Sequence, residues 1–87
     1  MEYLLRYHPK VAEDDLEDIP TNLHTRIARS IRERLASEPT RYGLPLRGSL
    51  KGYWKLRVGD YRVVFKVKGQ EVWILTILHR REVYEAV

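Results

Sequence analysis

The stretch that decides the fold reads Tyr53-Trp54-Lys55-Leu56-Arg57-Val58-Gly59-Asp60-Tyr61-Arg62-Val63-Val64-Phe65. Before the Gly59-Asp60 pair, residues suited to a core alternate with basic residues, and a strand places successive side chains on opposite faces of a sheet. Lys55 and Arg57 therefore share one face, while the other face holds Trp54, Leu56 and Val58. Because Gly59-Asp60 is typical of a tight turn, we predict a hairpin with an apolar and a basic face, and with Arg62 near its head.

The chain around this hairpin predicts a meander of three strands, at Tyr53–Val58, Tyr61–Lys68 and Glu71–His79. Residues 72–78 are apolar on both faces, which indicates a central strand. Alternation along it places His79 with Trp73, Leu75 and Ile77. Residues 41–52 are rich in glycine and predict a loop with a short extended piece around Leu46.

The N-terminal half predicts a strand at Glu2–Tyr7 and then two helices. Pro9 suits the first turn of a helix whose apolar stripe is Ala12, Leu16 and Ile19, and Pro20 breaks that helix. Apolar residues then recur every four positions, at Leu23, Ile27, Ile31 and Leu35, before Pro39 ends the second helix.

These patterns predict one α+β domain over residues 1–87. Its elements are an N-terminal strand, a helical hairpin and an antiparallel three-strand meander. The two helices of the helical hairpin have an apolar side that a sheet must cover, so we expect them to lie on one face of a twisted sheet.

Charge is distributed unevenly along the chain. The net charge is +4, but residues 1–40 carry six Lys/Arg and eight Asp/Glu, whereas residues 41–87 carry ten Lys/Arg and four Asp/Glu. The predicted strands therefore hold the positive charge, which points to nucleic acid or an acidic protein as a partner. The plainer alternative is a basic domain with scattered surface lysines.

Other residue types exclude several classes of protein. The chain has no cysteine, and His8, His24 and His79 lack the spacing of metal ligands, so we expect no metal and no cofactor. No apolar run approaches the ~20 residues of a membrane span, and the N-terminus lacks the form of a signal peptide. We expect a cytoplasmic protein.

In the order of its elements and in three motifs, the chain resembles the RelE/ParE superfamily of bacterial toxins. The motifs are Leu46-Arg47-Gly48, the stretch quoted above, and His79-Arg80-Arg81-Glu82-Val83-Tyr84. The resemblance implies the toxin of a type II toxin–antitoxin module, with an acidic, partly disordered antitoxin as partner. In the RelE branch it implies cleavage of messenger RNA on the ribosome, and in the ParE branch inhibition of DNA gyrase by protein binding.

Metal-free RNA cleavage uses the ribose 2′-OH as nucleophile, so the protein must supply a base, an acid and fixed cations for the phosphate. The resemblance implies that Lys55 is a catalytic lysine, that Arg62 stabilises the phosphate and that Arg81 lies near the leaving group. It also implies that Tyr84 stacks on a base or helps proton transfer. His79 is a further candidate, since some RelE relatives have a histidine near this point. Candidate RNA-binding residues are Arg47, Lys51, Arg57 and Arg80.

Each of these residues also has a structural interpretation. Lys55 would be a surface lysine, Arg62 would form an ion pair with Asp60 or Glu71, and His79 would close the core. Arg81 would be the solvated end of a strand, and Tyr84 would cap the sheet edge. We predict an mRNA interferase of RelE type, and the alternatives are a ParE-like gyrase inhibitor and an inactive member that only binds its partner.

Overall fold

The computed structural model describes residues 2–79 of the 87-residue chain. The sheet contains β1 (Leu4–Tyr7), β2 (Leu44–Pro45), β3 (Trp54–Val58), β4 (Tyr61–Lys68) and β5 (Glu71–His79). The two α-helices are α1 (Thr21–Ser30) and α2 (Pro39–Tyr42), with the π-helical η3 (Ile31–Leu35) between them. Further helical turns are the π-helical η1 (Val11–Asp15) and the 3-10 helices η2 (Leu16–Asp18) and η4 (Gly48–Leu50).

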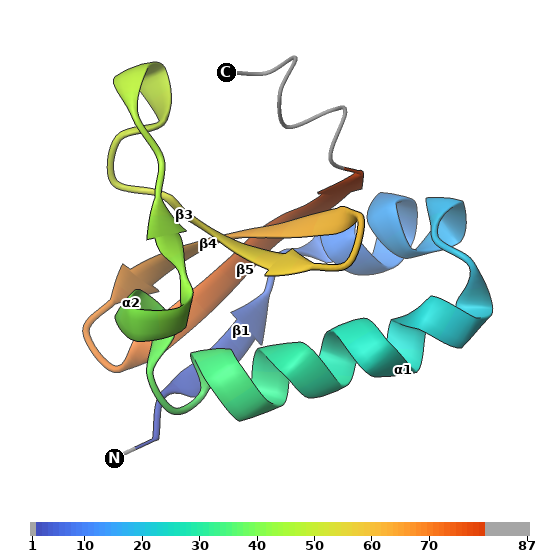
Figure 1. Cartoon of the computed structure of the whole chain (residues 1–87), viewed down its shortest axis with the longest axis horizontal. Helices are drawn as coiled ribbons and strands as arrows, with labels where there is room; N and C mark the ends of the chain where they lie inside the picture. Colours follow the sequence, from blue (N-terminus) through green and yellow to red (C-terminus); the bar gives the residue numbers. More distant parts are fainter. Residues whose placement is uncertain (1, 80–87) are drawn as a thin grey trace.

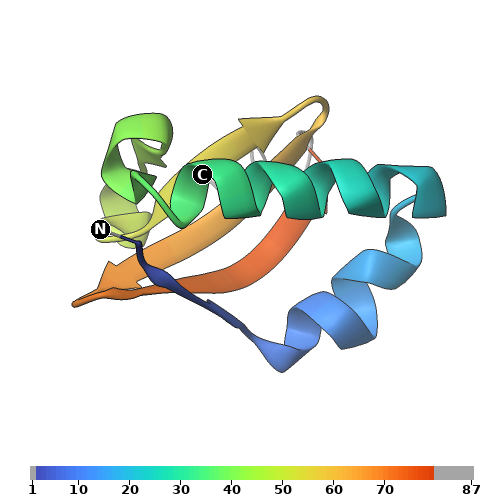
Figure 2. The ribbon, with the colours of Figure 1, turned by 90° about the horizontal axis from the view of Figure 1, so that it is seen from below.

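The five strands form one mixed sheet in the order β1-β5-β4-β3-β2 (Figure 1). β1 runs parallel to β5, and the other neighbouring pairs are antiparallel. α1 continues directly into η3, and this long helix lies across one face of the sheet (Figure 2). The predicted α+β class, element order and one-sided helical layer are therefore confirmed.

The core lies between the long helix and that face of the sheet. Ile27, Ile31 and Leu35 are buried at the predicted four-residue spacing. They meet the apolar side chains of β3, β4 and β5, among which Phe65 and Ile74 have no exposed surface. Of the hairpin residues, Leu56 and Val58 face this core as expected, so the basic side chains of β3 point to the other face.

The predicted elements differ from the structure in five details. The first strand begins at Leu4 and not at Glu2. The short extended piece that was expected around Leu46 is Leu44–Pro45, which pairs with β3. The first helix is a π turn followed by a 3-10 turn, so its stripe shifts and Val11 is buried in place of Ala12. Residues 39–42 form α2, because Pro39 starts a new helical turn as well as ending the previous one.

The fifth difference concerns β5, where an extra residue interrupts the alternation. Val64 pairs with Thr76 and Phe65 pairs with Ile74, which leaves Leu75 as a β-bulge. Ile74 and Ile77 are consequently both buried, although they are three residues apart. The bulge therefore separates Trp73 and Leu75 from the face that holds Ile77 and His79. Within residues 2–79, no helix is long and apolar enough to cross a membrane.

Candidate functional site

The basic side chains of the hairpin gather on the sheet face away from the long helix. Lys55 and Arg57 alternate with the buried residues of β3, and Arg57 is the direct cross-strand partner of Arg62 on β4. Lys55 is partly buried and Arg57 is exposed, whereas Arg62 is only 4% exposed. The structure thus brings together three of the cations predicted from the sequence.

Arg62 is held by the backbone of the turn beside it. Its Nη1 donates hydrogen bonds to the carbonyl oxygens of Gly59, at 3.2 Å, and Tyr61, at 3.1 Å. Gly59 has a φ of +60°, which an L side chain rarely adopts, so the glycine sets the turn that presents its carbonyl.

Within residues 2–79, no carboxylate forms an ion pair with Arg62. The structural alternative, an ion pair of Arg62 with Asp60 or Glu71, is therefore not formed, and Glu71 instead accepts a hydrogen bond from Arg6 Nε at 3.2 Å. A buried cation is costly without an opposite charge. The described part of the chain therefore leaves Arg62 suited to an anion from outside.

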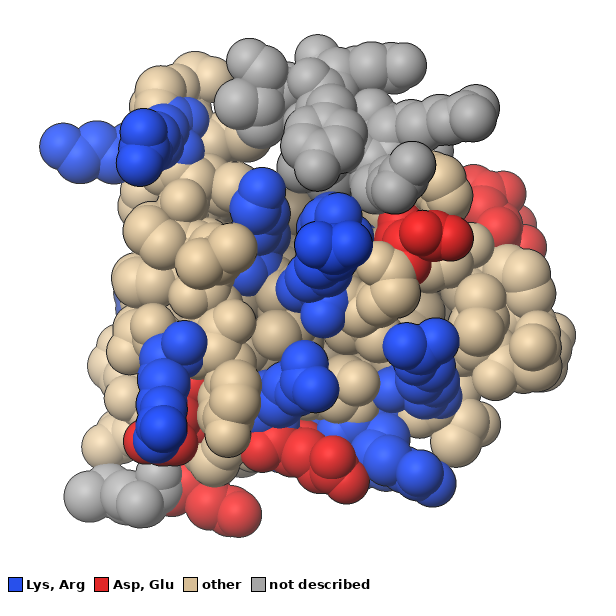
Figure 3. Space-filling view, in the orientation of Figure 1, with Lys and Arg blue, Asp and Glu red and all other residues tan. Residues whose placement is uncertain are grey.

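A groove of about 350 Å³ adjoins these cations. Among residues 2–79, its charged lining consists of four cations and no carboxylate, and the lining residues are Arg34, Tyr42, Leu44, Lys55, Leu56, Arg57 and Arg62. Figure 3 shows Lys and Arg side chains across the middle of the molecule, with acidic side chains mainly to the right of them and along the bottom. The arrangement of charges suits a polyanion.

Sequence reasoning missed Arg34 and Tyr42. Arg34 lies at the end of η3 and Tyr42 in α2, and the Arg34 Cζ atom is 5.8 Å from the centroid of the Tyr42 ring. Neither belongs to an alternating basic pattern, so only the packing of helix against sheet brings them to the groove. The one signal in the sequence is an aromatic residue just before a glycine in a basic loop, which is weak.

His79 lies apart from the groove. Its cross-strand partner is Tyr61, whose ring it meets edge-on at a centroid distance of 5.5 Å. Both residues line a small cavity of about 140 Å³ on the core side, together with Asp15 of η1 and Ile77 of β5. The structure therefore does not bring His79 together with Lys55 and Arg62, and its position agrees with the structural interpretation.

Arg47 and Lys51 are exposed in the segment around η4 and do not line the groove. Arg80, Arg81 and Tyr84 lie outside the described residues. Of the nine residues predicted from sequence, the structure thus places Lys55, Arg57 and Arg62 together.

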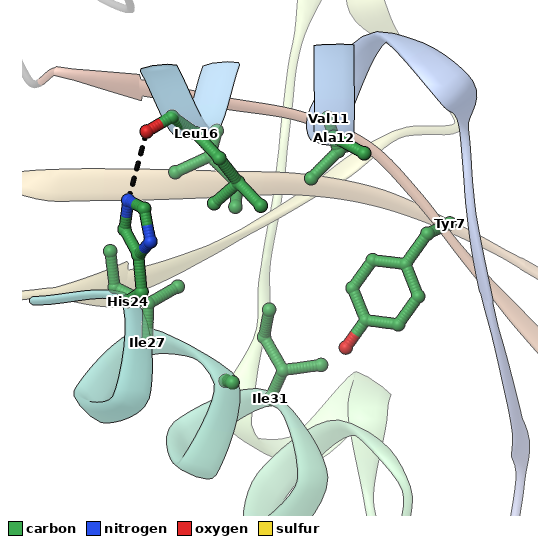
Figure 4. Close-up of a pocket in the computed structure, with 9 residues that line it drawn as sticks. Tyr7, Val11, Ala12, Leu16, His24, Ile27 and Ile31 are labelled. Carbon is green, nitrogen blue, oxygen red and sulfur yellow. Dashed lines mark hydrogen bonds between the residues drawn. The ribbon is translucent and has the colours of Figure 1, made fainter. Parts of the chain in front are cut away.

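A second, apolar cavity of about 300 Å³ lies between η1 and the long helix, and Tyr7 and His24 contribute its polar atoms (Figure 4). His24 Nε2 lies 2.8 Å from the carbonyl oxygen of Leu16 and 2.9 Å from that of Ile19, so this nitrogen donates and ties η2 to α1. Burial raises the pKa of Tyr7 above its ordinary value of 10.0, and the positive charge of Arg32 partly offsets the increase.

Comparison with known proteins identifies relatives along nearly the whole chain. Residues 5–84 match the family described as the ParE toxin of the type II toxin–antitoxin system, parDE. The toxin RelG of Mycobacterium tuberculosis is 31% identical over 86 residues, which cover 97% of this chain and 98% of RelG. The toxin RelE of the same organism is 32% identical over 83 residues, covering 90% of this chain and 86% of RelE.

Solved structures agree with these relatives. The toxin–antitoxin complex RelBE2 from Mycobacterium tuberculosis contains a chain with a TM-score of 0.84 and 29% identity, covering 92% of this chain and 100% of that one. A chain of the archaeal RelE–RelB complex from Pyrococcus horikoshii has a TM-score of 0.68 and 27% identity, and the match covers 92% of this chain and 97% of that one. By sequence and by fold, the chain belongs to the RelE/ParE superfamily of type II toxins, in its RelE family.

Proposed function

We propose that this RelE-family toxin is a ribosome-dependent mRNA interferase. In this reaction the ribose 2′-OH of the message attacks the adjacent phosphate, and the bond to the leaving 5′-oxygen breaks. RNA supplies its own nucleophile, so the protein must bind the phosphate, stabilise the charge that develops on it and move two protons. Action at the ribosome would place the protein in the cytoplasm.

The proposal rests mainly on the environment of the Arg62 side chain. Its guanidinium is buried at the groove, two backbone carbonyls fix its orientation, and no carboxylate among residues 2–79 neutralises it. A cation that is fixed in place before the substrate arrives needs little reorganisation as charge develops on phosphorus. Arg62 therefore suits the role of transition-state stabiliser.

Arg57 and Lys55 extend the same site. Arg57 lies opposite Arg62, and Lys55 lies two residues along the same face of β3, so one phosphate group can meet more than one of the three cations. Guanidinium groups can bind two phosphate oxygens at once. The roles of Lys55 as base, and of Arg81 and Tyr84 near the leaving group, stay predictions.

We also propose an antitoxin as partner. The RelBE2 and archaeal RelE–RelB structures are complexes of such a toxin with its antitoxin. In this chain an acidic, partly disordered antitoxin would meet a groove whose charged lining, within residues 2–79, is basic. Loss of growth arrest when the antitoxin is co-expressed tests this; failure of every acidic candidate encoded beside the toxin to bind would count against it.

The test of cleavage uses purified toxin and programmed ribosomes, with the message 5′ ends mapped. Wild type should cut in the A site, and a 2′-O-methyl group at the cut position should block the reaction. Removing a fixed donor from a developing charge costs about 10²- to 10³-fold in rate, so Arg62→Ala should lose at least that much. Lys68→Ala, which removes an exposed cation of β4 that does not line the groove, is the matched control.

Two results would overturn the proposal. One is message that stays whole with a protein that still arrests growth. The other is full cleavage by Arg62→Ala. DNA breaks made by gyrase, with message intact, would instead support the ParE-like alternative.

A further inference from the structure

The large exposed apolar side chains of residues 2–79 fall at the two opposite edges of the sheet. Leu4 and Tyr7 belong to β1 at one edge, while Leu44 belongs to β2 at the other edge and Tyr42 to α2 just before it. Tyr7 and Tyr42 are almost equally exposed, at 46% and 45%. Only Tyr42 lies among cations in the groove, which makes the two tyrosines a natural comparison.

The Tyr42 ring is held in place although it is exposed. The Arg34 guanidinium lies over the ring, with Cζ at 5.8 Å from the centroid, and a cation in this position is attracted to an aromatic face. The Tyr42 N–H donates to the Glu38 carbonyl at 3.1 Å, and the next N–H, of Gly43, donates to the Pro39 carbonyl at 2.9 Å.

Gly43 fixes the backbone further. It packs so closely on Phe65 that a Cβ at this position would come within 2.4 Å of the Phe65 ring. The residue after Tyr42 is thus locked against the core, so the tyrosine is presented from a rigid base. A ring carried on a fixed backbone loses less conformational freedom on binding than a ring on a mobile loop.

The neighbours of Tyr42 indicate what the ring binds. Leu44, two residues on, pairs with Lys55 of β3, and the groove that Tyr42 lines also contains Arg57 and Arg62. A surface that combines fixed cations with an exposed aromatic ring matches single-stranded nucleic acid, in which phosphates alternate with bases. The groove volume of about 350 Å³ lies near the lower end of ligand pockets, which run from about 300 to 1,000 Å³, and suits a nucleotide rather than a duplex.

An acidic peptide would also satisfy the cations. However, it would leave unexplained why an aromatic ring is ordered beside them, since carboxylates gain nothing from stacking. A base gains from the ring face, and Arg34 on the other side of the ring adds a further cation near the strand.

We infer that Tyr42, backed by Arg34, is a base-stacking subsite for the RNA nucleotide next to the phosphate held by Arg57 and Arg62. The inference rests on the proposed function, because it takes the RNA strand as the occupant of the groove. Stacking tolerates any base, so the subsite positions the message and does not read its sequence. Arg34 is a positioning residue for the ring.

The test uses programmed ribosomes whose A-site codon carries 2′-O-methyl groups, so that the toxin binds without cutting. Binding is measured for wild type, Tyr42→Ala and Tyr42→Phe, with Tyr7→Ala as the control of equal exposure. Loss of a stacked base costs about ten-fold or more in affinity. We expect that loss for Tyr42→Ala, and near-wild-type binding for Tyr42→Phe and Tyr7→Ala, with melting temperatures confirming that each variant is folded.

A second arm replaces each nucleotide of the codon and its neighbours in turn by an abasic one. At one position the missing base should weaken the binding of wild type about ten-fold and leave the binding of Tyr42→Ala unchanged, as expected for a ring and a base that contact each other. Equal losses for both proteins at every position would overturn the inference.

The cleavage assay separates this inference from the proposed function. Cleavage by wild type, together with unaltered binding by Tyr42→Ala, overturns the subsite and leaves the interferase standing. No binding or cleavage by wild type overturns both. A Tyr42→Ala variant that loses affinity only for the antitoxin would assign the ring to a peptide and reject the inference.

Discussion

Arg57 and Arg62 lie directly opposite each other on β3 and β4, and both line a groove to which the described part of the chain contributes no carboxylate. Like charges in this position repel each other and weaken the pairing of strands. The hairpin therefore keeps an unfavourable contact that a bound phosphate would relieve. Stability and binding should respond in opposite directions when this contact is removed.

We expect Arg57→Gln to raise the free energy of unfolding by about 0.2–1 kcal/mol, because it removes that repulsion. The same variant should cleave message more slowly. Urea denaturation at low salt measures the stability. The control is Lys66→Gln, since Lys66 lies over the Tyr53 ring at 5.6 Å and has no cation opposite it in the register. A less stable Arg57→Gln protein would contradict the prediction.

Salt should distinguish the phosphate contacts from the base contact. Each cation that binds a phosphate of single-stranded RNA contributes about 0.7 to the slope of log affinity against log salt concentration. Arg57→Gln and Arg62→Gln should each reduce the slope by about that amount. Tyr42→Ala should weaken binding with the slope unchanged; three equal slopes would show that neither arginine contacts phosphate.

Substitution of Asp15 should lower the free energy of unfolding more than substitution of any other polar residue in the described core. This buried carboxylate accepts hydrogen bonds from Thr76 Oγ1 at 2.8 Å, the Ile77 N–H at 2.9 Å and Lys10 Nζ at 2.6 Å. Asp15→Ala leaves a buried N–H without its partner, at a cost of about 1–3 kcal/mol in the free energy of unfolding. The control is the exposed neighbour Asp14, for which Asp14→Ala should change the free energy of unfolding in urea denaturation by at most about 0.5 kcal/mol.

Gly43→Ala should destabilise the fold and disturb the groove at the same time. The added Cβ would lie 2.4 Å from the Phe65 ring and 2.8 Å from the Pro39 carbonyl oxygen, so the packing must shift at a cost of about 1–3 kcal/mol. Gly69→Asn is the control, because nothing lies within 4 Å of a Cβ there and asparagine tolerates the φ of +62°. Thermal unfolding compares the two, and equal melting temperatures would contradict the packing argument.

Ionisation of the Tyr7 phenol should lower the free energy of unfolding at high pH. Desolvation raises its pKa above the unfolded value of 10.0, with Arg32 opposing, so the folded state holds the phenol proton that the unfolded state loses. The contribution of Tyr7 is present below about pH 10 and is lost as the pH rises through the folded pKa. Unfolding measured at pH 9 and pH 11 should show a smaller drop for Tyr7→Phe than for wild type. An equal drop in the two proteins would contradict the assignment to Tyr7.

The long strands could be predicted because local rules determine them. Tyr61–Lys68 and Glu71–His79 match β4 and β5 at both ends, since tight turns at Gly59-Asp60 and Gly69-Gln70 bound apolar runs of strand length. The helical spacing of Ile27, Ile31 and Leu35 likewise predicted the face that is buried.

Site residues could be predicted only where they lie on a strand whose apolar and basic residues alternate regularly. Lys55 and Arg57 follow from the period of two, but the bulge at Leu75 changes the phase of β5 and moves His79 to the core side. No pattern in a single sequence marks where a strand gains an extra residue. Arg34 and Tyr42 reach the groove through the packing of α2 against η3 and the pairing of β2 with β3, which depend on contacts beyond the local sequence pattern.

The parallel pairing of β1 with β5 has a consequence for synthesis of the protein. β1 is the first described strand and β5 the last, with Leu4 opposite Glu71, so the sheet cannot close until residues 71–79 have emerged from the ribosome. Pairing between such distant segments is slow, because the chain loses entropy before the contacts form. A nascent chain would therefore lack the finished sheet for most of its translation and, if the proposed function holds, the ribosome that makes this toxin would be spared until the last strand is in place.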